Sequence, residues 1–156
     1  AKENFYKVDF IFLLSLMVID GSDNVDYFIY KFKISKKDQK RMLFINNFYK
    51  LNITSKTFSE KNLNSLLYFN GKEALIDILN FKLFRSKKLD IKLVKLIANY
   101  KEKKIPILPI KANILMTKYN LVQGKELGNK LNTIEQIWVN NNFRISEKEV
   151  EDIVNN

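Results

Sequence analysis

Apolar side chains recur at intervals of three and four residues along most of the chain, a spacing that places them on one face of a helix. Strict alternation of apolar and polar positions, typical of a half-buried strand, occurs only briefly, at Tyr30, Phe32 and Ile34. The pattern therefore predicts an all-α fold of about eight helices in a helical bundle or array. The predicted helical segments are residues 4–19, 23–33, 36–51, 60–70 and 72–85 (which adjoin at Gly71), 90–100, 112–118, 124–141 and 146–154.

Several helix ends carry recognisable signals. Ser35 and Ser146 are good N-cap residue types, and each is followed three residues later by an acid, Asp38 and Glu149. Both serines are therefore predicted to begin helices. Gly71 predicts a left-handed stop between two helical segments.

A break separates two helical blocks. Pro106 and Pro109 fix their own φ and disfavour helix at the residues before them. We therefore expect a helical body over residues 1–104 and a helical tail over residues 105–156. The tail is predicted to be anchored by an apolar stripe made of Leu127, Leu131, Ile134 and Trp138.

The formal net charge of +10 is unevenly distributed. Residues 31–130 carry 23 basic and seven acidic side chains, whereas residues 1–30 and residues 131–156 each carry a net charge of −3. A basic centre of this kind is typical of proteins that bind polyanions. A lysine-rich surface that only contacts solvent fits the same distribution, and charge alone leaves both interpretations open.

The chain contains neither cysteine nor histidine. Disulfides, Cys/His zinc sites and Ser-His or Cys-His catalysis within this sequence are therefore excluded. The sequence contains no Walker lysine after a glycine loop and no EF-hand loop, so we predict no catalytic residue, no metal ligand and no cofactor in this segment. Gly124 and Gly128 leave two interpretations open: a phosphate held at a helix N-terminus with Lys125, or close packing against another helix.

Four segments, in this order, carry a resemblance to a known family. They are Lys31-Phe-Lys-Ile-Ser35, Leu63-Asn-Ser-Leu-Leu-Tyr-Phe-Asn-Gly71, Leu108-Pro-Ile-Lys-Ala112 and Gly124-Lys-Glu-Leu-Gly128, the last followed by Leu131, Glu135, Trp138 and Phe143. Over roughly residues 28–150 the chain resembles the C-terminal body and tail of bacterial CCA-adding tRNA nucleotidyltransferases and the related poly(A) polymerases. Where the family has arginines in the second segment, this chain has Asn64 and Ser65.

The resemblance implies a division of labour within a longer protein. The family's chemistry belongs to an N-terminal head that uses Mg²⁺ with ATP or CTP, and its Asp-x-Asp and Glu-Asp-x-x-Arg motifs do not occur here. We therefore expect this chain to be a piece of a longer cytoplasmic protein, inactive alone, with its own head domain and tRNA or another RNA as partners. CCA addition and poly(A) addition are not distinguished by these residues. The apolar run from Phe10 to Ile19 is about half the roughly 20 residues that cross a bilayer, so no membrane partner is expected.

The expected RNA contacts are basic side chains that can reach a phosphate backbone. A-form RNA offers proteins mainly its shape, phosphates and 2′-hydroxyls, so contacts without base specificity suffice. The predicted RNA-binding residues are Lys36, Lys37, Lys40, Arg41, Lys82, Arg85, Lys87, Lys88, Lys101, Lys103, Lys104 and Lys125. The alternative is a helical module that binds another protein, in which the lysines have no RNA role.

Overall fold

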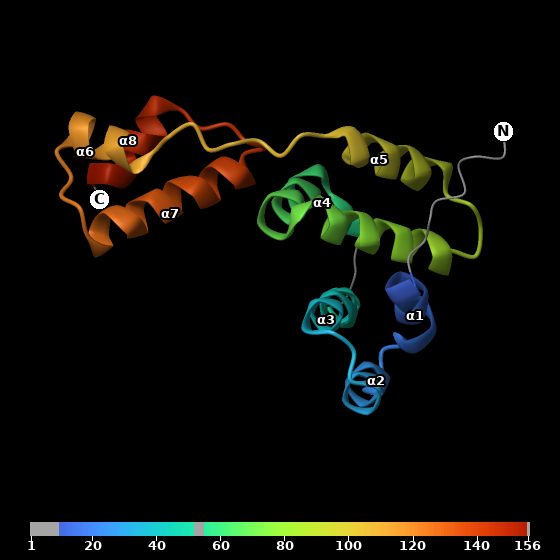
Figure 1. The fold of residues 1–156 in the computed structure, drawn as a ribbon. Coiled ribbons are helices and arrows are strands. Elements are labelled where there is room, and N and C mark those ends of the chain that lie inside the picture. The colour runs from blue at the N-terminus through green and yellow to red at the C-terminus, as the bar shows by residue number, and fades with distance from the viewer. Residues whose placement is uncertain (1–9, 52–54, 156) are drawn as a thin grey trace. The chain divides into compact units, whose positions relative to one another are not determined.

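The computed structural model describes residues 10–51 and 55–155, and within these ranges it is all-helical without a strand (Figure 1). The predicted fold class is confirmed. The elements are α1 (Phe10–Val18), α2 (Asn24–Phe32), α3 (Lys36–Lys50), a 3-10 turn (Ser55–Phe58), α4 (Glu60–Arg85), α5 (Ile91–Glu102), α6 (Ala112–Tyr119), α7 (Lys125–Asn140) and α8 (Glu147–Asn155). The predicted helix start at residue 4 lies outside the described residues.

The caps that begin α3 and α8 are formed as predicted. The Ser35 hydroxyl oxygen accepts a hydrogen bond from the Asp38 backbone N–H at 3.2 Å. The Ser146 hydroxyl oxygen accepts from the Glu149 N–H at 3.2 Å, and the Glu149 carboxylate accepts from the Ser146 backbone N–H at 2.7 Å. Each bond satisfies an N–H group that the first helical turn leaves without a partner, which is why these sequences begin helices.

Gly71 separates two helical halves of α4, residues 60–70 and 72–85, as predicted. It has φ 83° and ψ 168°, a conformation adopted almost only by glycine. Because its ψ lies outside the left-handed helical range, the prediction of a break at Gly71 was right, but the prediction of a left-handed helical conformation was wrong.

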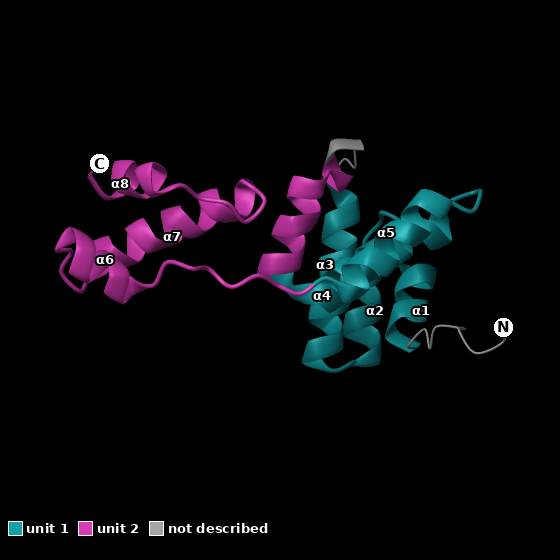
Figure 2. Cartoon of the chain, turned by 90° about the horizontal axis from the view of Figure 1, so that it is seen from above, with its two compact units in different colours: residues 1–55, 70–103 teal, residues 56–69, 104–156 magenta. Residues whose placement is uncertain are grey.

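The contacts divide the chain into two compact units (Figure 2). The first, the α1–α5 unit, comprises residues 1–55 and 70–103, and the second, the C-terminal unit, comprises residues 56–69 and 104–156. The boundary inside α4 falls next to the Gly71 kink. The sequence-based division placed residues 56–69 with the body, whereas this segment groups with the C-terminal helices.

The α1–α5 unit has a core drawn from its first four helices. Six buried side chains form it: Phe12, Ile19, Val25, Met42, Ile45 and Phe81. The ring of Tyr49 lies 4.6 Å from that of Phe81, and its hydroxyl donates to the Ile78 carbonyl at 3.0 Å. These contacts hold α3 against the second half of α4.

The C-terminal unit has its own core of Leu115, Leu127, Ile134, Val150 and Val154. Beside it, Trp138 is 3% exposed and packs edge-on against Tyr68 at 5.4 Å and Phe143 at 5.0 Å. The Tyr68 hydroxyl donates to the Glu135 carboxylate at 2.6 Å. The predicted stripe on α7 therefore faces this core, and Trp138 anchors α7 to the first half of α4.

Candidate nucleic-acid interface

The lysines at the start of α3 form an exposed basic cluster among the predicted RNA-binding residues. Lys36, Lys37 and Lys40 lie within the first five residues of the helix, and all three are exposed. The positive end of the helix macrodipole lies there, so cations at these positions are unfavourable, and Asp38 in the same turn offsets them only in part. Helix capping therefore does not explain these lysines. A phosphate group would be attracted both by them and by the helix end.

Arg41, one turn further along α3, is engaged inside the protein. Its Nε and Nη2 donate to the two carboxylate oxygens of Asp77 at 2.5 Å and 2.7 Å. Asp77 belongs to α4 and its side chain is only 8% exposed, against 28% for Arg41. This two-point ion pair joins α3 to α4, so the structure shows Arg41 as a structural residue.

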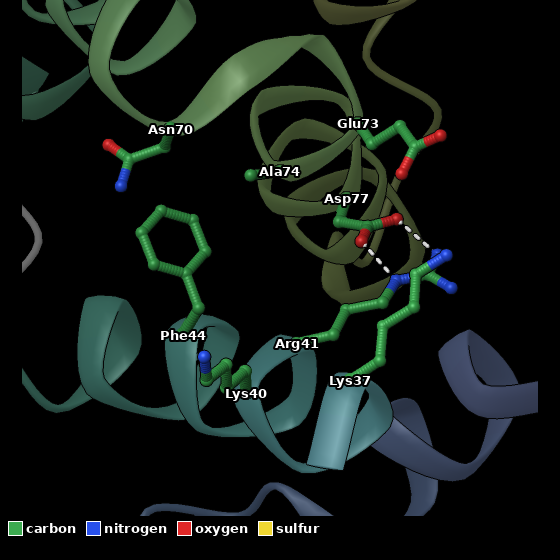
Figure 3. A pocket seen from close by; sticks show the side chains of 8 residues that line it. All are labelled: Lys37, Lys40, Arg41, Phe44, Asn70, Glu73, Ala74 and Asp77. Carbon is green, nitrogen blue, oxygen red and sulfur yellow. Dashed lines mark hydrogen bonds and ion pairs between the residues drawn. The ribbon is translucent and has the colours of Figure 1, made fainter. Parts of the chain in front are cut away.

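A pocket of about 290 Å³ opens beside this ion pair, between α3 and the second half of α4 (Figure 3). The α3 side contributes Lys37, Lys40, Arg41 and Phe44, and the α4 side contributes Asn70, Glu73, Ala74 and Asp77. Figure 3 shows the Phe44 ring projecting from α3 toward Asn70 on α4. The pocket thus combines an aromatic ring, an amide, carboxylates and ammonium groups at one place.

The basic residues at the end of α4 are in part used within the protein. The Arg85 guanidinium lies 5.0 Å from the Phe81 ring centre and donates to the Ile19 carbonyl. Lys82 is half-buried, whereas Lys87 and Lys88 are exposed in the connection to α5. Cations near a helix C-terminus also complement the macrodipole, so a structural role accounts for this cluster.

The remaining predicted contacts are scattered. Lys103 lies 5.0 Å from the Tyr100 ring centre, and Lys101 is half-buried. Lys104 and Lys125 are exposed but belong to the C-terminal unit. Lys36, Lys37 and Lys40 therefore share the first five residues of one helix, whereas the other predicted residues belong to later parts of the two units.

Gly124 and Gly128 do not serve close packing. A Cβ atom added to either glycine would meet no atom of another described element within 4 Å. The close-packing interpretation is therefore wrong for the described residues. Lys125 is the first residue of α7, and the N-cap residue Gly124 has no side chain that could cap the helix.

The two units differ in charge. The α1–α5 unit holds 18 basic and ten acidic residues, a net charge of +8, and the C-terminal unit holds nine and seven, a net charge of +2. Most of the positive charge therefore belongs to the unit that also contains the α3 lysines and the pocket. Long-range attraction of a polyanion would be strongest toward this unit.

The pocket was not found from the sequence. Phe44, Asn70 and Glu73 belong to helices that periodicity predicts separately, and no spacing rule indicates which two helices lie together. The sequence offered one signal for a binding surface here, a lysine cluster at a helix start, because the helix dipole disfavours cations at that end.

Other kinds of site are not seen in the described residues. No group of three or more acidic residues there is arranged to hold a metal ion. Nor does any described helix combine the length and apolarity needed to span a bilayer. Comparison with models of protein families, with curated proteins and with solved structures finds no match to this chain.

Proposed function

We propose that this chain is the RNA-binding, non-catalytic part of a tRNA nucleotidyltransferase or poly(A) polymerase. In this proposal a separate head domain carries Mg²⁺, ATP or CTP and the nucleotidyl transfer chemistry. The helices of this chain grip the RNA backbone and so set where its 3′ end lies. The ordered family-like segments support the family part of the proposal.

One observation carries the RNA-binding part. Lys36, Lys37 and Lys40 are exposed together at the N-terminal end of α3, where the macrodipole disfavours cations. In the free protein these lysines interact unfavourably with the positive end of the helix dipole. A phosphate backbone that lies across them offsets this interaction. The unit that contains them also carries +8 of the net charge of +10.

The test compares two triple variants with the same change of charge. The first variant replaces three α3 lysines, Lys36, Lys37 and Lys40, with Gln. The second replaces three exposed lysines of the C-terminal unit, Lys61, Lys111 and Lys148, with Gln. Binding of labelled tRNA is measured by fluorescence anisotropy at low salt. We expect the first variant to bind roughly tenfold or more weakly and to show a smaller salt dependence, because each lost phosphate contact lowers the slope by about one.

The matched variant is expected to lose much less affinity, because it changes only the overall charge. Equal losses in the two variants would mean that net charge alone drives binding and that α3 is no interface. Circular dichroism spectra of both variants, compared with the parent, establish that the helices are intact.

A second candidate function is binding of another protein, and α1 favours it. Phe10, Leu13 and Met17 lie at i, i+3 and i+7, on one face of α1, and are 71%, 45% and 81% exposed. An exposed apolar stripe is typical of a surface that meets another molecule. Failure of tRNA to bind at low salt, with intact helices, would favour this candidate.

A further inference from the structure

The pocket between α3 and α4 contains the groups that recognise a nucleobase. A flat aromatic ring can stack on the face of a base, and an amide or a carboxylate can read its edge. Phe44 is half-buried, Asn70 and Glu73 are exposed at their side of the pocket, and Lys37 and Lys40 line the same opening. No other described residue hydrogen bonds to, or forms an ion pair with, the side chains of Asn70 and Glu73, so both are available to a ligand.

The size of the pocket limits what can enter it. Small-molecule sites usually measure roughly 300–1,000 Å³, and this one, at about 290 Å³, lies at the lower end. One base fits that scale, whereas a paired duplex does not. The Arg41–Asp77 pair forms part of the wall, and its two short hydrogen bonds hold α3 and α4 at a set spacing before any ligand arrives.

We infer that this pocket binds one unpaired nucleotide of an RNA strand whose base carries an exocyclic amine beside a ring acceptor, adenine or cytosine, with Phe44 stacked on the base, Asn70 and Glu73 at its edge, and Lys37 and Lys40 on the adjoining phosphates. This inference rests on the proposed RNA-binding function and specifies the ligand of the same surface. The two lysines thereby serve both the backbone contact and the pocket.

The requirement for an exocyclic amine follows from the edge groups. An asparagine amide donates to and accepts from adenine through two hydrogen bonds, which is its common pairing, and cytosine offers the same donor and acceptor. The Glu73 carboxylate only accepts, so it suits the exocyclic amine of adenine or cytosine and repels the carbonyl oxygens of uracil. Stacking on Phe44 adds affinity but selects little, because every base has a flat face.

The experiment measures binding of labelled oligoadenylate and oligouridylate of equal length at one salt concentration. We expect the parent protein to prefer oligoadenylate about tenfold, the usual discrimination of one two-point base contact. Phe44→Leu keeps an apolar side chain but removes the ring, and should weaken oligoadenylate binding about tenfold. Tyr30→Leu is its control, because Tyr30 is an 83% exposed ring on α2, outside the pocket.

Glu73→Gln provides a sharper test. The glutamine amide can donate to a uracil oxygen, so this variant should bind oligouridylate more tightly and lose most of the preference for adenine. Glu102→Gln removes the same charge from an exposed position on α5 and should leave the preference unchanged. Asn70→Ala should also reduce the preference.

The outcomes distinguish failure of the pocket inference from failure of the proposed RNA-binding function. An RNA duplex cannot place a base in the pocket, so Phe44→Leu and Glu73→Gln should still bind it with the same salt dependence as the parent. Salt-dependent duplex binding together with no adenine preference, or a preference that survives Glu73→Gln, would overturn the pocket inference and leave the proposed function standing. Absence of binding to every RNA would overturn both.

A competition experiment tests whether a free nucleotide binds the same pocket as a nucleotide within an RNA strand. Adenosine monophosphate is added to the complex of the parent protein with labelled oligoadenylate. Displacement that Phe44→Leu abolishes supports the pocket and assigns it to a single nucleotide. Displacement that is unchanged in Phe44→Leu contradicts the pocket, because the nucleotide would then bind elsewhere.

Discussion

The ion pair between Arg41 and Asp77 should be a main stabilising contact of the α1–α5 unit. Asp77→Asn keeps the shape of the side chain but replaces one acceptor oxygen with an amide that faces the guanidinium. Exposed ion pairs contribute about 0–1 kcal/mol, whereas removing one partner of a buried pair costs about 3–5 kcal/mol. Here the acid is 8% exposed and the guanidinium 28%, so water can partly solvate the remaining charge. We therefore expect a loss of about 2 kcal/mol in the free energy of unfolding.

Urea unfolding followed by circular dichroism measures this loss. Lys50→Gln is the matched control, because it breaks the Lys50–Asp23 pair in the same unit, whose side chains are 36% and 93% exposed. The control should change the free energy of unfolding by no more than about 0.5 kcal/mol. A double-mutant cycle with Arg41→Gln should show a coupling of at least about 1 kcal/mol. A coupling near zero, or an Asp77→Asn protein as stable as the control, would refute the structural role given to this pair.

Three further changes test other parts of the structure. Trp138→Ala should lower the free energy of unfolding by about 3–5 kcal/mol, measured in urea, while RNA affinity of the folded protein is retained; a fully stable variant that lost RNA affinity would contradict this. Gly71→Ala should lower the free energy of unfolding by about 1–3 kcal/mol through backbone strain alone, because a Cβ atom there meets no atom within 4 Å. Its control, Gly128→Ala, lies in the first turns of α7, where a Cβ atom also meets no atom within 4 Å, and should not lower it. Burial of the hydroxyl, reinforced by Glu135, raises the pKa of Tyr68 to about 12, which favours the neutral form in the folded state. The contribution of Tyr68 to the free energy of unfolding should therefore be fully present below pH about 10 and should be lost as the pH approaches 12. In urea unfolding at those pH values, Tyr68→Phe should show a smaller decrease in the free energy of unfolding than the parent protein.

The helices could be predicted because their signals are local. Ser35 and Ser146 satisfy backbone N–H groups within their own first turns, so short sequences decide where α3 and α8 begin. Trp138 was placed on the apolar stripe of α7 by spacing alone, and it is buried. Gly71 shows the limit of local signals. The glycine indicated the break between residues 60–70 and 72–85, but its ψ of 168° depends on how the two helical halves pack.

The site was predictable only in part because its geometry depends on contacts between helices. Exposure of Lys37 and Lys40 follows from the position of the apolar face of α3, whereas Arg41, expected to point outward with them, is half-buried. The partner of Arg41, by contrast, lies 36 residues away, and no pattern in the sequence connects the two. The same holds for Phe44 and Glu73, which come from different helices and meet only in the fold.

Binding of tRNA across a range of salt concentrations tests the central claim most directly. If the α1–α5 unit binds the phosphate backbone through its lysines, the logarithm of the affinity should fall linearly with the logarithm of the salt concentration. Three contacts alone predict a loss of at least about tenfold between roughly 50 and 200 mM monovalent salt. An affinity that does not change with salt, or no binding at the lowest salt concentration, would contradict the account.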